Sequence, residues 1–246
     1  MRVVTAQRKV VAEAVGTALL ASAVIGSGIM AQQLASDRAG ALLANTIATG
    51  GALIAILLMF GPISGAHLNP AVTVCMAITK EVTPRLAAAY VGAQIAGGIA
   101  GAIVANAMFD RSLVTWSETA RSGSAQLLSE GVAMFGLVGV VISVGRTRAP
   151  AAPLAVASYI VAAYWFTAST SFANPALTVA RAFSNTFTGI RPEDIGGFIV
   201  AQAVGATLGA LLFSWLVPRR GSTAVAADRA SGHAAQISPS TRSRSG

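Results

Sequence analysis

The chain has 246 residues, of which 54% are hydrophobic and only 11% charged, and its mean hydropathy is +0.67. Soluble domains carry about 25% charged residues, so this composition excludes an ordinary soluble protein and predicts a membrane protein. The single cysteine excludes an intrachain disulfide, and no cluster of Cys and His has the spacing of a metal site, so we expect no metal and no cofactor.

Six apolar segments are long enough to cross a bilayer, which takes about 20 residues. A short basic segment, 1–9, precedes them and is expected to be cytoplasmic. The six segments are 10–30, 41–60, 83–107, 126–145, 152–169 and 195–217. Residues 218–246 are rich in Ser, Ala and Arg without periodicity, which predicts a disordered cytoplasmic tail.

Two further apolar runs, 70–78 and 175–183, are too short to cross and are expected to be half-helices. Both begin with the triplet Asn-Pro-Ala. Asn is a preferred helix N-cap and Pro is tolerated at the first helical position, so each triplet predicts a helix start. The residues of the two triplets are Asn69, Pro70, Ala71, Asn174, Pro175 and Ala176.

The channel-like region, 10–217, divides into two similar halves, about 10–107 and about 126–217. Glu13 and Glu130 lie early in the first span of each half, and Gln94 and Gln202 lie in the last span, before paired glycines. Each half has three spans, so the second half must enter the membrane from the opposite side, and the repeat is inverted.

Lys and Arg are concentrated in the segments that lie inside when the N-terminus is inside. This predicts a multi-pass protein of the cell (plasma) membrane with both termini in the cytoplasm. The formal charge of +8 is then a topology signal, and we expect membrane lipid, not nucleic acid, around the chain.

An inverted pair of half-helices places two helix N-termini tip to tip near the middle of the membrane. Each end carries partial positive charge and unpaired N–H groups, which disfavours cations and protons. The Asn side chains offer donors to a neutral polar molecule, and the preceding loops, expected to be extended, offer carbonyls as acceptors. The residues expected to offer these acceptor carbonyls are Gly65, Ala66, His67, Thr170, Ser171 and Phe172.

Over 10–217 the chain resembles the aquaporin (major intrinsic protein) family. The resemblance rests on the two triplets, the paired Glu and Gln residues, and the segment 64–73, which is nearly the family signature of the first half. It implies an all-α membrane protein: an aquaporin-like right-handed bundle of six transmembrane helices plus two re-entrant half-helices. It also implies a pore in every subunit and a homotetramer.

The family's selectivity constriction is located by distance from each Asn. These distances assign Thr49, Ala162, Ser171 and Leu177 to it. Leu177 occupies the position where the family usually has Arg, and all four residues are small or uncharged, so we expect a wide, uncharged constriction. Some bacterial relatives associated with arsenic resistance also lack this Arg and have an Ala-Arg pair afterwards, like Ala180 and Arg181 here.

For three side chains, the sequence leaves two interpretations open. Arg181 lies four residues after Leu177, on the same helix face: it either guards the outer vestibule or caps carbonyls and snorkels to the interface. Glu13 and Glu130 either brace the pore-lining loops by accepting their N–H groups or relay protons, since ionisable groups within spans mark function.

The sequence therefore predicts a passive channel for small neutral solutes. The candidates are water, glycerol-like polyols, urea and undissociated arsenous acid. Two alternatives remain: an ion- or proton-coupled carrier built on inverted repeats, and a non-conducting membrane scaffold. No set of residues suggests catalysis.

Overall fold

The computed structural model describes residues 4–218. The predicted tail, apart from Pro218, and the first three residues lie outside this part of the chain. Within it, six helices are long and apolar enough to cross a membrane, as predicted. They are α1 (Ala6–Leu34), α2 (Arg38–Ser64), α4 (Pro84–Met108), α5 (Ser124–Thr147), α6 (Ala152–Phe166) and α8 (Ile195–Leu216), and the spans of the last two include the short turns that precede them.

The first two spans are longer than their apolar segments because polar caps set their ends. The Thr5 side chain accepts a hydrogen bond from the Arg8 N–H before α1, and Asp37 accepts one from Gly40 before α2. Gly65 ends α2 in the left-handed region, with φ of 92°, which glycine adopts without a steric penalty. Short 3₁₀ turns, Ala149–Ala151 and Pro192–Asp194, lead into α6 and α8.

Both short runs are half-helices. The nine-residue α3 (Pro70–Ile78) and the six-residue α7 (Pro175–Ala180), which continues as a 3₁₀ turn over Arg181–Phe183, begin at the predicted residues. At 1.5 Å per residue they are about 14 Å and 9 Å long, against a hydrocarbon layer of about 30 Å. Neither can cross the membrane alone.

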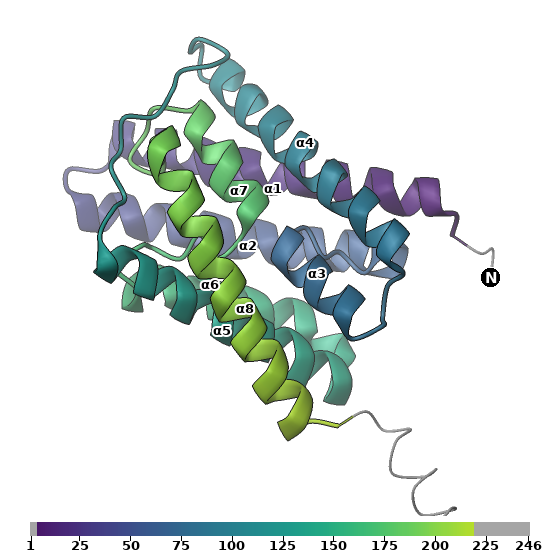
Figure 1. Cartoon of the computed structure of the whole chain (residues 1–246). Coiled ribbons are helices and arrows are strands. Elements are labelled where there is room, and N and C mark those ends of the chain that lie inside the picture. Colours follow the sequence, from purple (N-terminus) through teal and green to yellow (C-terminus); the bar gives the residue numbers. More distant parts are fainter. Residues whose placement is uncertain (1–3, 219–246) are drawn as a thin grey trace, which may run out of the picture.

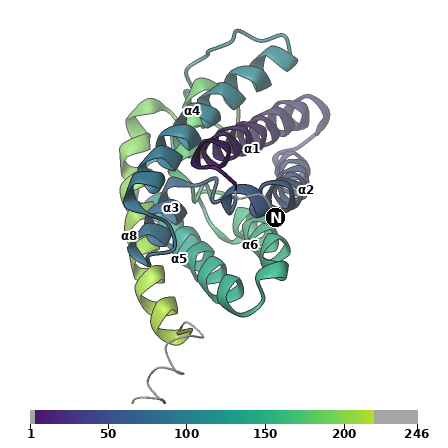
Figure 2. The same cartoon turned by 90° about the vertical axis from the view of Figure 1, so that its right-hand side faces the viewer.

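The half-helices lie toward opposite ends of the bundle, which confirms the inverted repeat (Figure 1). α1 packs against α4, and α5 packs against α8 in the same way. Each half-helix also contacts the other half of the chain: α3 lies between α4 and α8 (Figure 2), and α7 contacts both of the same helices. The two halves therefore interlock, and the tips of α3 and α7 meet inside the bundle.

Glycines set the closest helix crossings. A Cβ atom on Gly97 would lie 2.1 Å from the Ala14 carbonyl oxygen, and one on Gly205 would lie 2.1 Å from the Gly131 carbonyl oxygen. No side chain fits at such distances, so the α1–α4 and α5–α8 crossings both depend on glycine. This close approach brings the carboxylates of α1 and α5 within reach of the loops that precede the half-helices.

Candidate functional site

A cavity of about 470 Å³ runs past the tips of the two half-helices. Glu81 and Arg146 line one end, which we call the Arg146 end, and their side chains lie 3.8 Å apart. Asn69 and Asn174 line the middle. Apolar side chains make most of the wall between these polar points, among them Leu20, Leu53, Leu137, Val141 and Ile160. Such a path is apolar with polar contacts at a few fixed depths.

The two Asn side chains join the half-helices tip to tip. Asn69 Nδ2 donates to the Ala173 carbonyl at 2.7 Å, and Asn174 Nδ2 donates to the Leu68 carbonyl at 2.8 Å. Each Asn Oδ1 accepts two N–H groups from the first turn of its own half-helix. One N–H of each amide is left for a molecule in the cavity, since a carboxamide has two donors.

Glu13 braces the loop before α3. Its Oε1 accepts from the His67 N–H at 2.9 Å, and its Oε2 accepts from the Leu68 N–H at 2.6 Å. Ser64 Oγ and Gln94 Nε2 donate to the same carboxylate, at 2.6 and 2.7 Å. All four donors converge on one buried charge, which is the condition under which a buried carboxylate is tolerated.

Glu130 repeats this arrangement in the second half. It accepts the Phe172 N–H at 2.8 Å, the Ala173 N–H at 2.9 Å and Gln202 Nε2 at 2.7 Å. Both carboxylates are fully buried, and neither is among the described residues that line the cavity. The geometry is that of loop bracing, and it places neither Glu13 nor Glu130 where a permeating molecule would pass.

Contrary to expectation, the loops before the two half-helices are not extended. Ala66, Leu68, Thr170, Ser171 and Ala173 all have positive φ, between 42° and 59°. Left-handed non-glycine residues cost roughly 1–2 kcal/mol each, and the carboxylate hydrogen bonds offset that strain. Gly65, Ala66, His67, Ser171 and Phe172 line the cavity, whereas Thr170 does not and its N–H donates to the Thr167 carbonyl.

Three of the four expected constriction residues, Thr49, Ser171 and Leu177, line the cavity. For Ala162 the structure differs from the prediction: Ala162 is exposed on the outside of α6, and Tyr164 faces inward. Two residues turn a helix by about 200°, which reverses the face. Counting back from Asn174 crosses the loop after α6, and helical spacing does not fix the length of that loop. The Tyr164 hydroxyl lies 3.4 Å from Thr49 Oγ1.

Arg181 lies at the end of the cavity opposite Arg146, which we call the Arg181 end. Its side chain is only 2% exposed yet lines the cavity. Its Nε donates to the Thr188 carbonyl, and its guanidinium lies 3.4 Å from the centre of the Phe172 ring. Arg181 therefore bonds a carbonyl, as one interpretation expected, and faces the path, as the other expected. It adds one positive charge beside the four positions counted from the sequence.

His67 also lines the cavity, and its Nδ1 lies 3.1 Å from Thr73 Oγ1. Cys75 is buried in the core that α3 shares with α5 and α8. Within residues 4–218, no group of three or more His, Cys, Asp or Glu side chains could hold a metal ion. Away from the charged side chains Glu81, Arg146 and Arg181 at its two ends, the cavity offers single donors and acceptors that suit a neutral hydrogen-bonding solute.

Comparison with known proteins agrees with this geometry. The family model for the major intrinsic protein matches residues 1–161. The chain is 54% identical, over 85% of its length and 90% of the relative, to the aquaglyceroporin AqpS of Rhizobium meliloti (strain 1021). It is 30% identical, over 84% of its length and 68% of the relative, to aquaporin NIP6-1 of Arabidopsis thaliana. The X-ray structure of the aquaglyceroporin from Plasmodium falciparum shares the fold, with a TM-score of 0.63 at 17% identity, over 85% of this chain and 96% of that one.

Proposed function

Because this chain belongs to the major intrinsic protein family, we propose that it is a passive membrane channel for small uncharged polar solutes. Water and glycerol-like polyols are the main candidates, in keeping with the aquaglyceroporin name of its 54% identical relative. The observation that carries the proposal is the pair of Asn amides, from half-helices of opposite direction, that face one cavity.

A neutral solute would exchange its water for fixed partners at the midplane. Asn69 and Asn174 each offer one N–H, and the loop carbonyls beside them offer acceptors. Two helix N-termini meet there, so the local potential is positive and disfavours protons and metal cations. Selection against cations is thus built into the backbone.

The selectivity constriction lies at the Arg181 end. Thr49, Tyr164, Ser171, Leu177 and Arg181 surround it. Among the described residues, Thr188 is the one hydrogen-bond acceptor for the Arg181 guanidinium, which leaves its two terminal nitrogens for solute hydroxyls. Such a site suits a compact molecule with oxygen acceptors, so urea, through its carbonyl, and undissociated arsenous acid, through its hydroxyls, join the proposed solutes.

The coupled-carrier alternative needs a titratable carboxylate pair at the solute path. Glu13 and Glu130 instead accept backbone N–H groups away from the cavity. A non-conducting scaffold would not need a cavity of about 470 Å³ past its midplane. Both observations favour the passive channel.

The proposed membrane arrangement places both termini in the cytoplasm of a plasma-membrane protein, with the Arg181 end outside. Four subunits, each with its own pore, form the proposed homotetramer. A fluorescent reporter fused after residue 246 matures only in the cytoplasm and tests the orientation. Native mass measurement of the purified channel tests the assembly, and a monomeric mass would contradict it.

Stopped-flow light scattering on liposomes tests the channel itself. Vesicles with the purified protein should respond to water, glycerol and arsenous acid gradients faster than protein-free vesicles. Leu177→Arg places a second guanidinium beside the path and should suppress glycerol while sparing water, whereas Leu177→Met should match the parent. If the parent responds no faster than empty vesicles, the proposed function is wrong; if Leu177→Arg passes glycerol as the parent does, the constriction is misplaced.

A further inference from the structure

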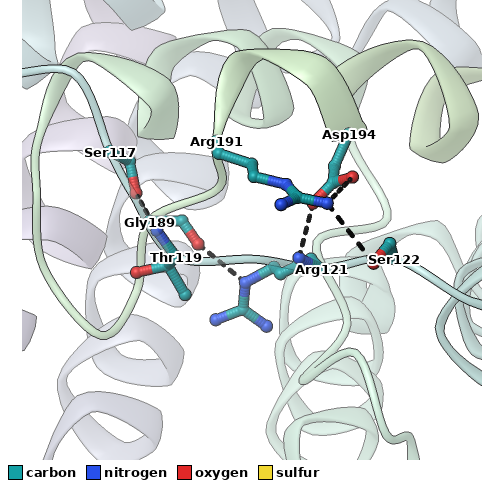
Figure 3. Close-up of polar contacts among 7 residues, drawn as sticks. All are labelled: Ser117, Thr119, Arg121, Ser122, Gly189, Arg191 and Asp194. Carbon is teal, nitrogen blue, oxygen red and sulfur yellow. Dashed lines mark hydrogen bonds and ion pairs between the residues drawn. The ribbon is translucent and has the colours of Figure 1, made fainter.

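Arg121 lies in the loop between α4 and α5 but is buried against the loop that follows α7 (Figure 3). Its side chain donates three hydrogen bonds to backbone carbonyls: Nε to Gly189 at 2.7 Å, Nη1 to Ser169 at 3.0 Å and Nη2 to Phe187 at 2.8 Å. Its backbone N–H donates to Asp194 Oδ2 at 2.6 Å. One residue thus connects three loops and the start of α8.

Two of these carbonyls belong to the neighbours of Thr188. Phe187 and Gly189 flank Thr188, whose own carbonyl accepts the hydrogen bond from Arg181 Nε. A peptide segment held on both sides has little freedom at its centre. The position of the Thr188 carbonyl, and with it the direction of the Arg181 side chain, therefore depends on Arg121.

Phe172 provides a second connection. The Arg121 guanidinium lies 4.7 Å from the centre of the Phe172 ring, and the Arg181 guanidinium lies 3.4 Å from the same ring centre. Phe198 packs edge-on against this ring, with centroids 5.2 Å apart. A cation near an aromatic face is attracted to it, so the ring that supports Arg181 is itself held by Arg121.

Burial lowers the pKa of Arg121 to about 10, and the nearby Glu130 carboxylate opposes that shift. The guanidinium therefore stays charged at neutral pH. Arg191 Nε donates to Asp194 at 2.8 Å, so the carboxylate that fixes the Arg121 backbone is itself held (Figure 3). These contacts give Arg121 a defined direction on the side of the loop away from the cavity.

We propose that Arg121, which does not touch the path, is a positioning residue for solute selection. It fixes the Phe172 ring and the Thr188 carbonyl, and through them it holds Arg181 at the constriction. The inference rests on the proposed channel function. It explains how a guanidinium one helical turn beyond Leu177 keeps a single position beside the path, although no carboxylate among the described residues pairs with it.

The test measures the ratio of glycerol to water permeability in liposomes. Arg121→Met keeps the apolar stem but removes the three donors, so Arg181 loses its fixed position and the constriction widens. We expect the ratio to rise about fivefold, which corresponds to ~1 kcal/mol in relative barrier height. Arg121→Lys, whose single ammonium cannot reach three carbonyls, should fall between the parent and Arg121→Met. Arg111→Met, in the same loop but exposed, is the matched control and should leave the ratio unchanged.

A double variant separates positioning from a general loss of structure. Arg181→Leu should raise the ratio by itself, and Arg121→Met added to it should have no further effect, because the group it positions is gone. If Arg121→Met does not fold, Arg121→Lys, which keeps the positive charge, tests the same connection and should still raise the ratio above that of the parent. The inference is overturned if folded Arg121→Met has the same glycerol-to-water ratio as the parent. It is also overturned if Arg121→Met raises the ratio of Arg181→Leu as much as it raises that of the parent. A parent no more permeable than empty vesicles overturns the channel proposal instead.

Discussion

Arg181 is a buried cation with which no carboxylate of residues 4–218 forms an ion pair. Moving a guanidinium out of water is costly unless other groups stabilise it. Here the Thr188 carbonyl and the face of the Phe172 ring do so. A carbonyl dipole and a π face attract the charge without taking the terminal N–H donors. A hydroxylated solute therefore meets donors that no carboxylate competes for, which is what a site for neutral molecules requires.

The Tyr164 ring lines the same cavity as these donors, and we expect its bulk to limit solute size. Tyr164→Ala removes the ring from the cavity lining and should raise glycerol permeability relative to water several-fold. Ala162→Leu, two residues away on the exposed face of the same helix, should leave both permeabilities unchanged. Stopped-flow measurements on equal amounts of reconstituted protein provide the comparison. If Ala162→Leu changed the ratio of glycerol to water permeability and Tyr164→Ala did not, Ala162 would belong to the constriction, as the count from Asn174 predicts.

The Glu130 carboxylate is expected to stabilise its loop and not to carry protons. Glu130→Gln places an amide N–H₂ against donors that now lack an acceptor, and an unsatisfied buried group costs about 1–3 kcal/mol. Thermal unfolding in detergent should occur at lower temperature, while Glu118→Gln in an exposed loop should match the parent. Glycerol uptake should be the same with and without an imposed pH gradient. A Glu130→Gln protein as stable as the parent but unable to transport would favour the proton relay.

At the scale of elements, the helices follow from local sequence and the loops do not. Apolar length and the Asn-Pro starts predict the spans and half-helices because both signals act within a few residues. The left-handed residues before each half-helix, such as Leu68 and Ala173, carry no such signal. Their φ values depend on hydrogen bonds to Glu13 and Glu130, 55 and 43 residues away in the chain. Five of the six loop residues named from the sequence line the cavity, but their backbone conformation could not be predicted.

The α1–α4 crossing gives an element-scale prediction. Gly97→Ala places a methyl group against the Ala14 carbonyl, so the helices must separate, and overpacking of this kind costs about 1–3 kcal/mol. Gly92→Ala in the same helix meets no atom within 4 Å and gains helix propensity. Thermal unfolding followed by circular dichroism should show a lower midpoint for Gly97→Ala and an unchanged or higher one for Gly92→Ala. Equal midpoints for the two variants would mean that the close crossing is not needed.

At the scale of the whole molecule, the sequence shows the repeat but does not show the contacts of Arg121 that hold the loops at the Arg181 end together. Corresponding Glu, Gln and Asn residues predict two similar halves, and the three spans in each half predict that the halves have opposite directions. The Arg121 network has no counterpart in that repeat. Its side-chain acceptors lie 48 to 68 residues away, and a charged residue in a polar loop looks like any solvated one. Tyr164 was missed for a related reason, since only the packed helix shows which face is inward.

The last prediction concerns the point where the two halves of the chain meet. Asn69 and Asn174 each place a neutral amide at a positive helix end, so the double variant Asn69→Asp/Asn174→Asp keeps both cap acceptors while adding two negative charges. It also removes the two amide donors that join the tips, at 2.7 and 2.8 Å. Negative charge at the midplane offsets the helix dipoles and attracts cations.

A pH-sensitive dye inside liposomes should report faster decay of a proton gradient in the double variant than in the parent. Asn185→Asp, in a loop away from the cavity, is the control and should hold the gradient as the parent does. If the double variant folds, passes water and remains proton-tight, the barrier to protons does not lie where the two half-helices meet.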